Sequence, residues 1–231
     1  PDNVEYKHLL AVSYQWLGKT YTSNGNLDKA LESFERYNLL EKELLKAIPD
    51  NVDYKHYLAI SYQWLGMTYT SIGNLSEALE SFERFNLLEK ELLEAIPDNV
   101  EYKHFLASSF QWLGNTYSSN GNLDKALESF ERFNLLEKEL HEVIPDNVEY
   151  KHLLAVSYQW LGMTYTSIGN LSEALESFER FNLLEKELHE TYPDNVDYKH
   201  SLAISYQGIG KTCTSIGNLS EALESFERFN L

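Results

Sequence analysis

The stretch QWLGKTYTSNGNLDKALESFER occupies residues 15–36 and decides how the chain folds. Similar stretches begin at Gln63, Gln111, Gln159 and Gln207, so the same unit recurs in constant steps of about 48 residues. The chain therefore consists of five tandem repeats, the last of which is shorter. We expect a single domain made of repeats 1–48, 49–96, 97–144, 145–192 and 193–231.

Each unit carries two runs of apolar residues with gaps of three and four, the spacing of one helix face. In the first unit these residues are Tyr6, Leu9, Leu10, Tyr14, Leu17 and Tyr21, followed by Leu27, Ala30, Leu31, Phe34, Leu40, Leu44 and Ile48. Between the runs, Gly25 can adopt the left-handed conformation that ends a helix, and Asn26 can cap the next one. Each unit is thus predicted to be a helical hairpin, with helices of about 21 residues, or roughly 31 Å.

Two further capping signals mark the helix starts. Asp2 is expected to cap the first helix, with Glu5 three residues later, and Pro49 ends the second helix of the unit. In repeats two, four and five the second helix begins with Asn-Leu-Ser-Glu, as at residues 74–77. That spacing is typical of a capping box, in which the Glu side chain bonds back to the cap.

The most informative motif reads Tyr14-x-x-Leu17-Gly18-x-x-Tyr21 and then Ala30-x-x-x-Phe34. It resembles the tetratricopeptide repeat, with a tyrosine at the first position where that family usually has tryptophan. The resemblance covers every unit. It implies an all-α fold, an α-solenoid of five antiparallel helical hairpins in a right-handed superhelix. In that family Gly18 and Ala30 are small so that the two helices can cross closely.

The chain departs from the family in length. The family repeats every ~34 residues, whereas this chain repeats every ~48 residues, so each helix has gained about seven. An addition of that length is close to two helical turns, which keeps the apolar face in phase. The family also tends to place a small residue where this chain has Tyr37, Phe85, Phe133, Phe181 and Phe229.

Composition excludes several classes of partner. The net charge is −17 and no unit is basic, which argues against binding to nucleic acid or anionic membranes. No apolar run approaches the length of a membrane span, and no signal peptide is visible, so a cytoplasmic location is expected. The single cysteine, Cys213, stands at a core position and should be a buried, inert thiol. Without an initiator Met, the chain is expected to be a piece of a longer array or an engineered one.

No catalytic or metal site is predicted. Glu5-x-x-His8 recurs in every unit, with Asp in place of Glu in two of them, and could offer two metal ligands on one helix face. Neighbouring units should stand roughly 10 Å apart, which makes a four-ligand site difficult to close. We therefore interpret these residues as surface polar groups. There is no nucleophile–base arrangement and no phosphate loop, so neither an enzyme nor a cofactor is expected.

A second stripe runs along each first helix beside the apolar face. In the tetratricopeptide family this face lines the concave groove that binds peptides, so the stripe is the predicted ligand groove. Its members are His8, Val12, Gln15, Lys19, His56, Ile60, Gln63, Met67, His104, Ser108, Gln111, Asn115, His152, Val156, Gln159, Met163, Gln207 and Lys211. The fixed glutamines could pair with a peptide backbone, or they could bond to one another between neighbouring helices.

A row of aromatic residues abuts this stripe: Trp16, Trp64, Trp112 and Trp160. Packing of repeat against repeat is the favoured interpretation, and anchoring of ligand side chains is the alternative. The fifth repeat has Gly208 at this position.

These patterns predict a protein- or peptide-binding scaffold. Its ligand should be neutral to basic and partly apolar, because the stripe lacks the cationic clamps that grip acidic tails. Two alternatives stay open: a structural spacer or self-associating rod with end-to-end contacts, and a designed or recently amplified array without an evolved ligand.

Overall fold

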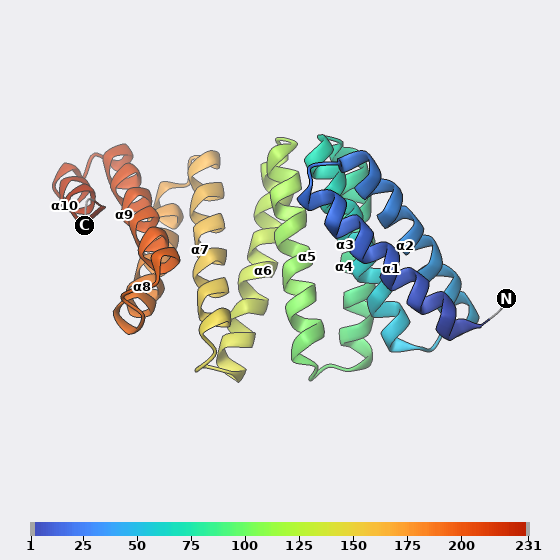
Figure 1. The fold of residues 1–231 in the computed structure, drawn as a ribbon. Coiled ribbons are helices and arrows are strands. Elements are labelled where there is room, and N and C mark those ends of the chain that lie inside the picture. The colour runs from blue at the N-terminus through green and yellow to red at the C-terminus, as the bar shows by residue number, and fades with distance from the viewer. Residues whose placement is uncertain (1–2, 230–231) are drawn as a thin grey trace. The chain divides into compact units, whose positions relative to one another are not determined.

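The computed structural model describes residues 3–229 and contains ten α-helices and no strand in that range (Figure 1). The helices are α1 (Val4–Ser23), α2 (Leu27–Ala47), α3 (Val52–Ile72), α4 (Leu75–Ala95), α5 (Val100–Ser119), α6 (Leu123–Val143), α7 (Val148–Ile168), α8 (Leu171–Thr191), α9 (Val196–Ile216) and α10 (Leu219–Phe229). The predicted all-α class is confirmed. Within the described residues, no helix is long and apolar enough to cross a membrane.

The chain divides into two compact units, residues 1–120 with α1 to α5 and residues 121–231 with α6 to α10. Inside each unit every helix packs against the next one along the chain. Hairpins form from α1 and α2, α3 and α4, α7 and α8, and α9 and α10. The expectation of one continuous domain stays a prediction.

Glycine lies in the turn after the first helix of each hairpin, as predicted. Gly25 has a φ of 71° and Gly73 a φ of 86°, in the left-handed region that glycine tolerates. Asn26 then caps α2, because its side chain accepts a hydrogen bond from the Lys29 amide at 3.3 Å. The turn chemistry of the sequence therefore fixes where each hairpin bends.

Two capping predictions are wrong. The cap of α1 is Asn3, whose side chain accepts from the Glu5 amide at 2.9 Å, whereas Asp2 lies outside the described residues. The capping box is absent in repeats two and four, where Asn74 and Asn170 form no side-chain cap. In repeat five the Asn218 side chain does accept from the Glu221 amide, at 3.5 Å, and donates to the Glu221 carboxylate at 2.6 Å. The asparagine following each Pro-Asp is the residue in extended conformation directly before the helix, so it is placed to reach the free amides.

One phenylalanine per repeat forms the centre of the packing. Phe34 is fully buried and covers Gly18, where an added Cβ would lie 2.5 Å from its ring. The ring also stacks on Trp64 of the next repeat, with 5.3 Å between ring centres and 12° between planes. The stack recurs between Phe82 and Trp112 and between Phe130 and Trp160, both at 5.4 Å. These tryptophans thus pack one repeat against the next.

A hydrogen-bonded clamp also joins consecutive repeats. The Asn38 amide donates to the Ser61 hydroxyl at 2.8 Å, and this hydroxyl donates to the Leu58 carbonyl at 2.6 Å. Equivalent bonds of 2.7–2.8 Å join Asn86 to Ser109, Asn134 to Ser157 and Asn182 to Ser205. Because each serine hydroxyl is fully buried and paired, each clamp fixes the register of one repeat on the next.

A buried carboxyl group faces the histidine of the same repeat. Glu89 is fully buried and its Oε1 lies 2.8 Å from Nδ1 of His56, which is only 9% exposed. His152 and Glu185 repeat this geometry at 2.8 Å, and His8 stands 3.6 Å from Glu41. The interpretation of these histidines as surface groups is therefore wrong for His56, because the second helix covers it.

Burial changes the ionisation of Glu41, of Glu89 and of Glu137, the equivalent residue of the third repeat. It raises the pKa of Glu41 from 4.5 to about 8, and it does the same for Glu137, with repulsion from Glu149 as a smaller cause. At Glu89 burial also raises the pKa, while the hydrogen bond from His56 lowers it. Glu41 and Glu137 are thus mostly protonated at neutral pH. Cys213 is buried as predicted, and burial raises the pKa of its thiol to about 11.

The clamp predicts a stability difference between two adjacent residues of α2. Asn38→Ala should lower the free energy of unfolding by about 1–3 kcal/mol, because it leaves the buried Ser61 hydroxyl without its donor. The control Leu39→Ala removes a side chain that is 46% exposed and should cost no more than ~0.5 kcal/mol. Urea unfolding measures both, and equal losses would exclude a role for the clamp.

The buried carboxyl predicts a pH dependence. The folded state binds more protons than the unfolded state between the two pKa values of Glu41, so its stability falls as pH rises from about 5 to about 8. Glu41→Gln removes this loss. The variant should gain stability relative to wild type, on the order of 1–3 kcal/mol, across that range.

Urea titrations near both ends of the range test this, with Glu43→Gln as control because that side chain is 47% exposed and pairs with Lys7. If the free energy of unfolding changed with pH equally in wild type and Glu41→Gln, the Glu41 carboxyl would not be the cause of the pH dependence.

Candidate functional site

The predicted stripe divides into a packed part and an open part. His8, His56 and His152 face the buried glutamates and belong to the packing. The remaining members are accessible to solvent in part or more. Half-buried are His104, Val12, Gln15, Lys19, Ile60, Gln63, Met67, Ser108, Gln111, Asn115, Val156, Gln159 and Gln207, and exposed are Met163 and Lys211.

The stripe glutamines are half-exposed. Inside each unit, and among the residues described, no hydrogen bond joins two of them. Gln207 accepts from the Lys211 ammonium at 3.1 Å, a contact within its own helix. Each of these side chains offers a donor and an acceptor at a half-exposed position.

Lys19 shows how this row of the stripe lies relative to the tryptophans. Its ammonium stands 4.9 Å from the ring centre of Trp16 and 4.8 Å from that of Trp64. The side chain at this position therefore lies over the indole of its own repeat and over the indole of the next repeat, at cation–π distance.

A cavity of about 450 Å³ opens on the stripe in the second unit, among α7, α8 and α9. Four stripe residues line it: Gln159 and Met163 from α7, and Gln207 and Lys211 from α9. Phe178, Ile204 and Gly208 form its apolar wall. The structure thus brings together stripe residues of repeats four and five around a concave, partly apolar site, and a volume of this size is typical of small-ligand pockets.

Hollows on the side of the second helices have a different character. One of about 360 Å³ lies beside Asn38, Lys42 and Tyr62, and one of about 250 Å³ lies beside the equivalent residues Asn134 and Tyr158. The Lys42 ammonium sits 5.0 Å from the Tyr62 ring centre. Because the same residues recur in both, we attribute these hollows to the repeat packing.

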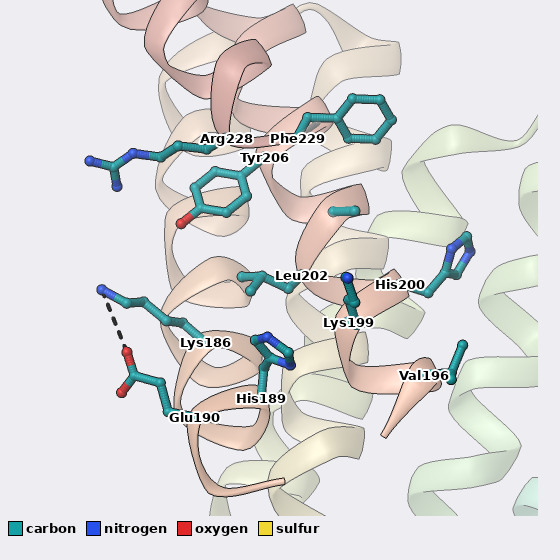
Figure 2. A pocket seen from close by; sticks show the side chains of 11 residues that line it. Lys186, His189, Glu190, Val196, Lys199, His200, Leu202, Tyr206, Arg228 and Phe229 are labelled. Carbon is teal, nitrogen blue, oxygen red and sulfur yellow. Dashed lines mark ion pairs between the residues drawn. The ribbon is translucent and has the colours of Figure 1, made fainter. Parts of the chain in front are cut away.

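A further hollow, about 560 Å³, lies among α8, α9 and α10 (Figure 2). Leu202 and Tyr206 of α9 line it, and the ion pair between Lys186 and Glu190, 3.9 Å long, lies at its edge. In the other hairpins of each unit, the C-terminal half of the second helix packs on the corresponding face of the first helix. The contact of Glu185 in α8 with His152 in α7 is one example. In residues 3–229, no three His, Cys, Asp or Glu side chains are grouped so that they could hold a metal ion.

Comparison with known proteins identifies the repeat. The family model of the tetratricopeptide repeat matches residues 11–43, 59–91, 107–138 and 155–186. No curated protein sequence matches the chain.

Solved structures share the fold. The putative kinesin light chain of Podosopora anserina, with nearly identical TPR-like repeats, is 20% identical with a TM-score of 0.70, over 97% of this chain and 94% of that one. BtubC from P. vanneervenii is 15% identical with a TM-score of 0.65, over 100% and 91%. YrrB, a TPR protein with an unusual peptide-binding site, is 20% identical with a TM-score of 0.53, over 95% and 84%.

Proteins of this kind generally mediate protein–protein interactions and generally act as non-catalytic scaffolds. The four matches together span more than half of the sequence, and the helices they cover form hairpins of the expected kind. The chain belongs to the tetratricopeptide repeat family.

Proposed function

We propose that the chain is a scaffold that binds a protein or peptide along the stripe of its first helices, the face that lines the concave groove in the family. The observation that carries this proposal is the cavity bounded by Gln159, Met163, Gln207 and Lys211. It is concave and mostly apolar, with a few polar groups at its rim, which is the usual character of a recognition site.

The residues of the stripe suit an extended segment. Glutamine side chains can donate to and accept from a peptide backbone without demanding one ligand sequence. Met67 and Met163 have flexible, polarisable side chains that adapt to different shapes. The stripe would therefore bind the backbone through its fixed residues and select side chains through its variable ones.

Charge favours a neutral or basic ligand. In every repeat a Glu or Asp stands three residues before the histidine of the first helix, next to the stripe, and the chain carries a net charge of −17. The variable row has two lysines, Lys19 in the first repeat and Lys211 in the fifth, so no two cations of the row stand side by side. An acidic segment would lose hydration without gaining a bidentate partner.

The proposal includes a variant of the family with lengthened helices and a period of about 48 residues in place of ~34. The first helices begin at Val4, Val52, Val100, Val148 and Val196, and they contain 20 or 21 residues. The added length includes His56, which lies between the matched segments 11–43 and 59–91 and faces the buried Glu89.

The stripe predicts which substitutions weaken binding. We expect short peptides selected from a phage-displayed library on the purified chain to be neutral or basic. Gln159→Ala and Met163→Ala should each weaken their binding by about five- to tenfold, as fluorescence anisotropy would measure. Leu183→Ala, which removes a half-exposed side chain of α8 away from the stripe, is the matched control. A preference for acidic peptides, or insensitivity to both stripe substitutions, would refute the proposal.

Self-association is the second candidate function, and exposed apolar residues in the first repeat favour it. Tyr6, Leu9 and Trp16 are 61–62% exposed, while Tyr102, the equivalent of Tyr6, is 6% exposed. We expect the scattering mass to rise with protein concentration and Leu9→Glu to suppress that rise. Leu87→Glu, at a position 45% exposed on α4, should not. A constant monomer mass at millimolar protein would rule this candidate out.

A further inference from the structure

The cavity on the stripe lies where the fifth repeat lacks a tryptophan. Four repeats read Gln-Trp-Leu-Gly, whereas the fifth reads Gln207-Gly208-Ile209-Gly210. In the three stacks described above, the missing residue is an indole that lies on the buried phenylalanine of the preceding repeat. Gly208 leaves Phe178 without that indole.

Phe178 responds to this vacancy. In the first two repeats an added Cβ on the glycine under the phenylalanine would lie 2.5 Å from the ring, but at Gly162 it would lie 3.0 Å from Phe178. The same ring lies 2.5 Å from a Cβ built at Gly208. Phe178 has thus moved from its own hairpin toward the empty position, yet it is 6% exposed where Phe34, Phe82 and Phe130 are fully buried. The ring fills the vacancy only in part, and the cavity remains.

The walls of the cavity match the surroundings of an indole. Lys211 follows Gly208 by three residues, as Lys19 follows Trp16, where the ammonium stands 4.9 Å from the ring centre. Met163 occupies the position of Lys19 one repeat earlier, which in the first repeat lies 4.8 Å from the indole of the following repeat. A ring in the cavity would therefore contact a phenyl face, an ammonium and a thioether.

We propose that this cavity is a pocket for the indole of a tryptophan presented by a partner polypeptide. The partner's tryptophan takes the place of the residue absent at position 208, stacks on Phe178 and lies beside Lys211 and Met163. The proposal rests on the proposed function, since it names the side chain that the stripe selects.

The contacts select tryptophan over other side chains. Tryptophan has the strongest cation–π attraction to an ammonium, and its ring also gains from contact with the methionine sulfur. A basic side chain would be repelled by Lys211, and a carboxylate would lose hydration against the apolar wall of Phe178 and Ile204. A leucine would fill less of the volume and would gain neither interaction.

The two methionines of the chain provide a direct experiment, because they occupy equivalent positions in repeats two and four. Met163 lines the cavity, whereas Met67 is followed in the next repeat by Trp112, which already stacks on Phe82. With both methyl groups labelled with carbon-13, titration with N-acetyl-tryptophanamide should shift the Met163 resonance saturably and leave the Met67 resonance in place. N-acetyl-leucinamide should shift neither.

Gly208→Trp closes the pocket with the residue that the other repeats carry. The Phe178 ring must then move back toward Gly162, because a Cβ at position 208 would lie 2.5 Å from that ring. The folded variant should shift the Met163 resonance in the absence of ligand and no longer respond to N-acetyl-tryptophanamide. Gly208→Leu fills part of the cavity without an aromatic ring and should weaken the Met163 response to N-acetyl-tryptophanamide. This variant tests the pocket even if Gly208→Trp does not fold. An unchanged response of Met163 in a folded Gly208→Trp or Gly208→Leu variant would overturn the pocket.

Peptides separate this inference from the proposed function. Stripe-binding peptides that contain tryptophan should bind wild type about tenfold more tightly than their alanine counterparts, and Gly208→Trp should abolish that difference. Peptides that bind through Gln159 with no preference for tryptophan would refute the pocket and leave the proposed function intact. The Met163 resonance could also shift when protein concentration rises without any ligand. If that shift vanished in Trp16→Ala, the occupant would be Trp16 of a second copy, and the proposal of a separate partner would be overturned.

Discussion

One buried phenylalanine per repeat, stacked between a glycine and a tryptophan, links the packing inside a hairpin to the packing between hairpins. Phe34 lies so close to Gly18 that a Cβ there would clash with its ring, and this sets the distance between the helices of a hairpin. The same ring lies on Trp64, which sets the position of the next hairpin. Because one ring determines both contacts, a change on either side is transmitted to the other, as the displacement of Phe178 beside Gly208 shows.

Buried polar groups then restrict the register of this apolar packing. Apolar contacts alone are not directional and would tolerate a shift of one repeat along the next. The bond from Asn38 to Ser61 forms in only one register of a repeat on the next. The contact of Glu89 with His56 does the same for the two helices inside one hairpin. Each group would lose its partner if the helices slipped, at the cost of an unsatisfied buried polar atom. Burying these polar groups costs free energy, but their bonds give the nearly identical repeats one defined register.

The sequence predicts the hairpins well because their boundaries are local. Asn24-Gly25-Asn26 determines the turn through backbone conformation and side-chain caps, independent of distant residues. No prediction is made from the sequence for the buried glutamates Glu41, Glu89, Glu137 and Glu185. A signal was present: Phe34, Tyr37, Glu41 and Leu44 are spaced by three, four and three, which places the carboxyl group on the apolar face. The partner of Glu41 is His8 on the preceding helix, so only the fold brings the two together.

The sequence predicts the helix face that carries the candidate site, but it does not predict the cavity on that face. Helical spacing places Gln159, Met163, Gln207 and Lys211 on one stripe, and the structure gathers these four around one hollow. The hollow itself depends on how far Phe178 moves toward Gly208, a balance of packing that no pattern of residues encodes. In an array of nearly identical repeats, the positions that all repeats share mainly serve the packing, so a ligand is distinguished chiefly by the positions that differ. Gly208 interrupts the regular stacking of tryptophan on phenylalanine, beside the variable residues of the stripe, and for this reason we propose the ligand pocket there.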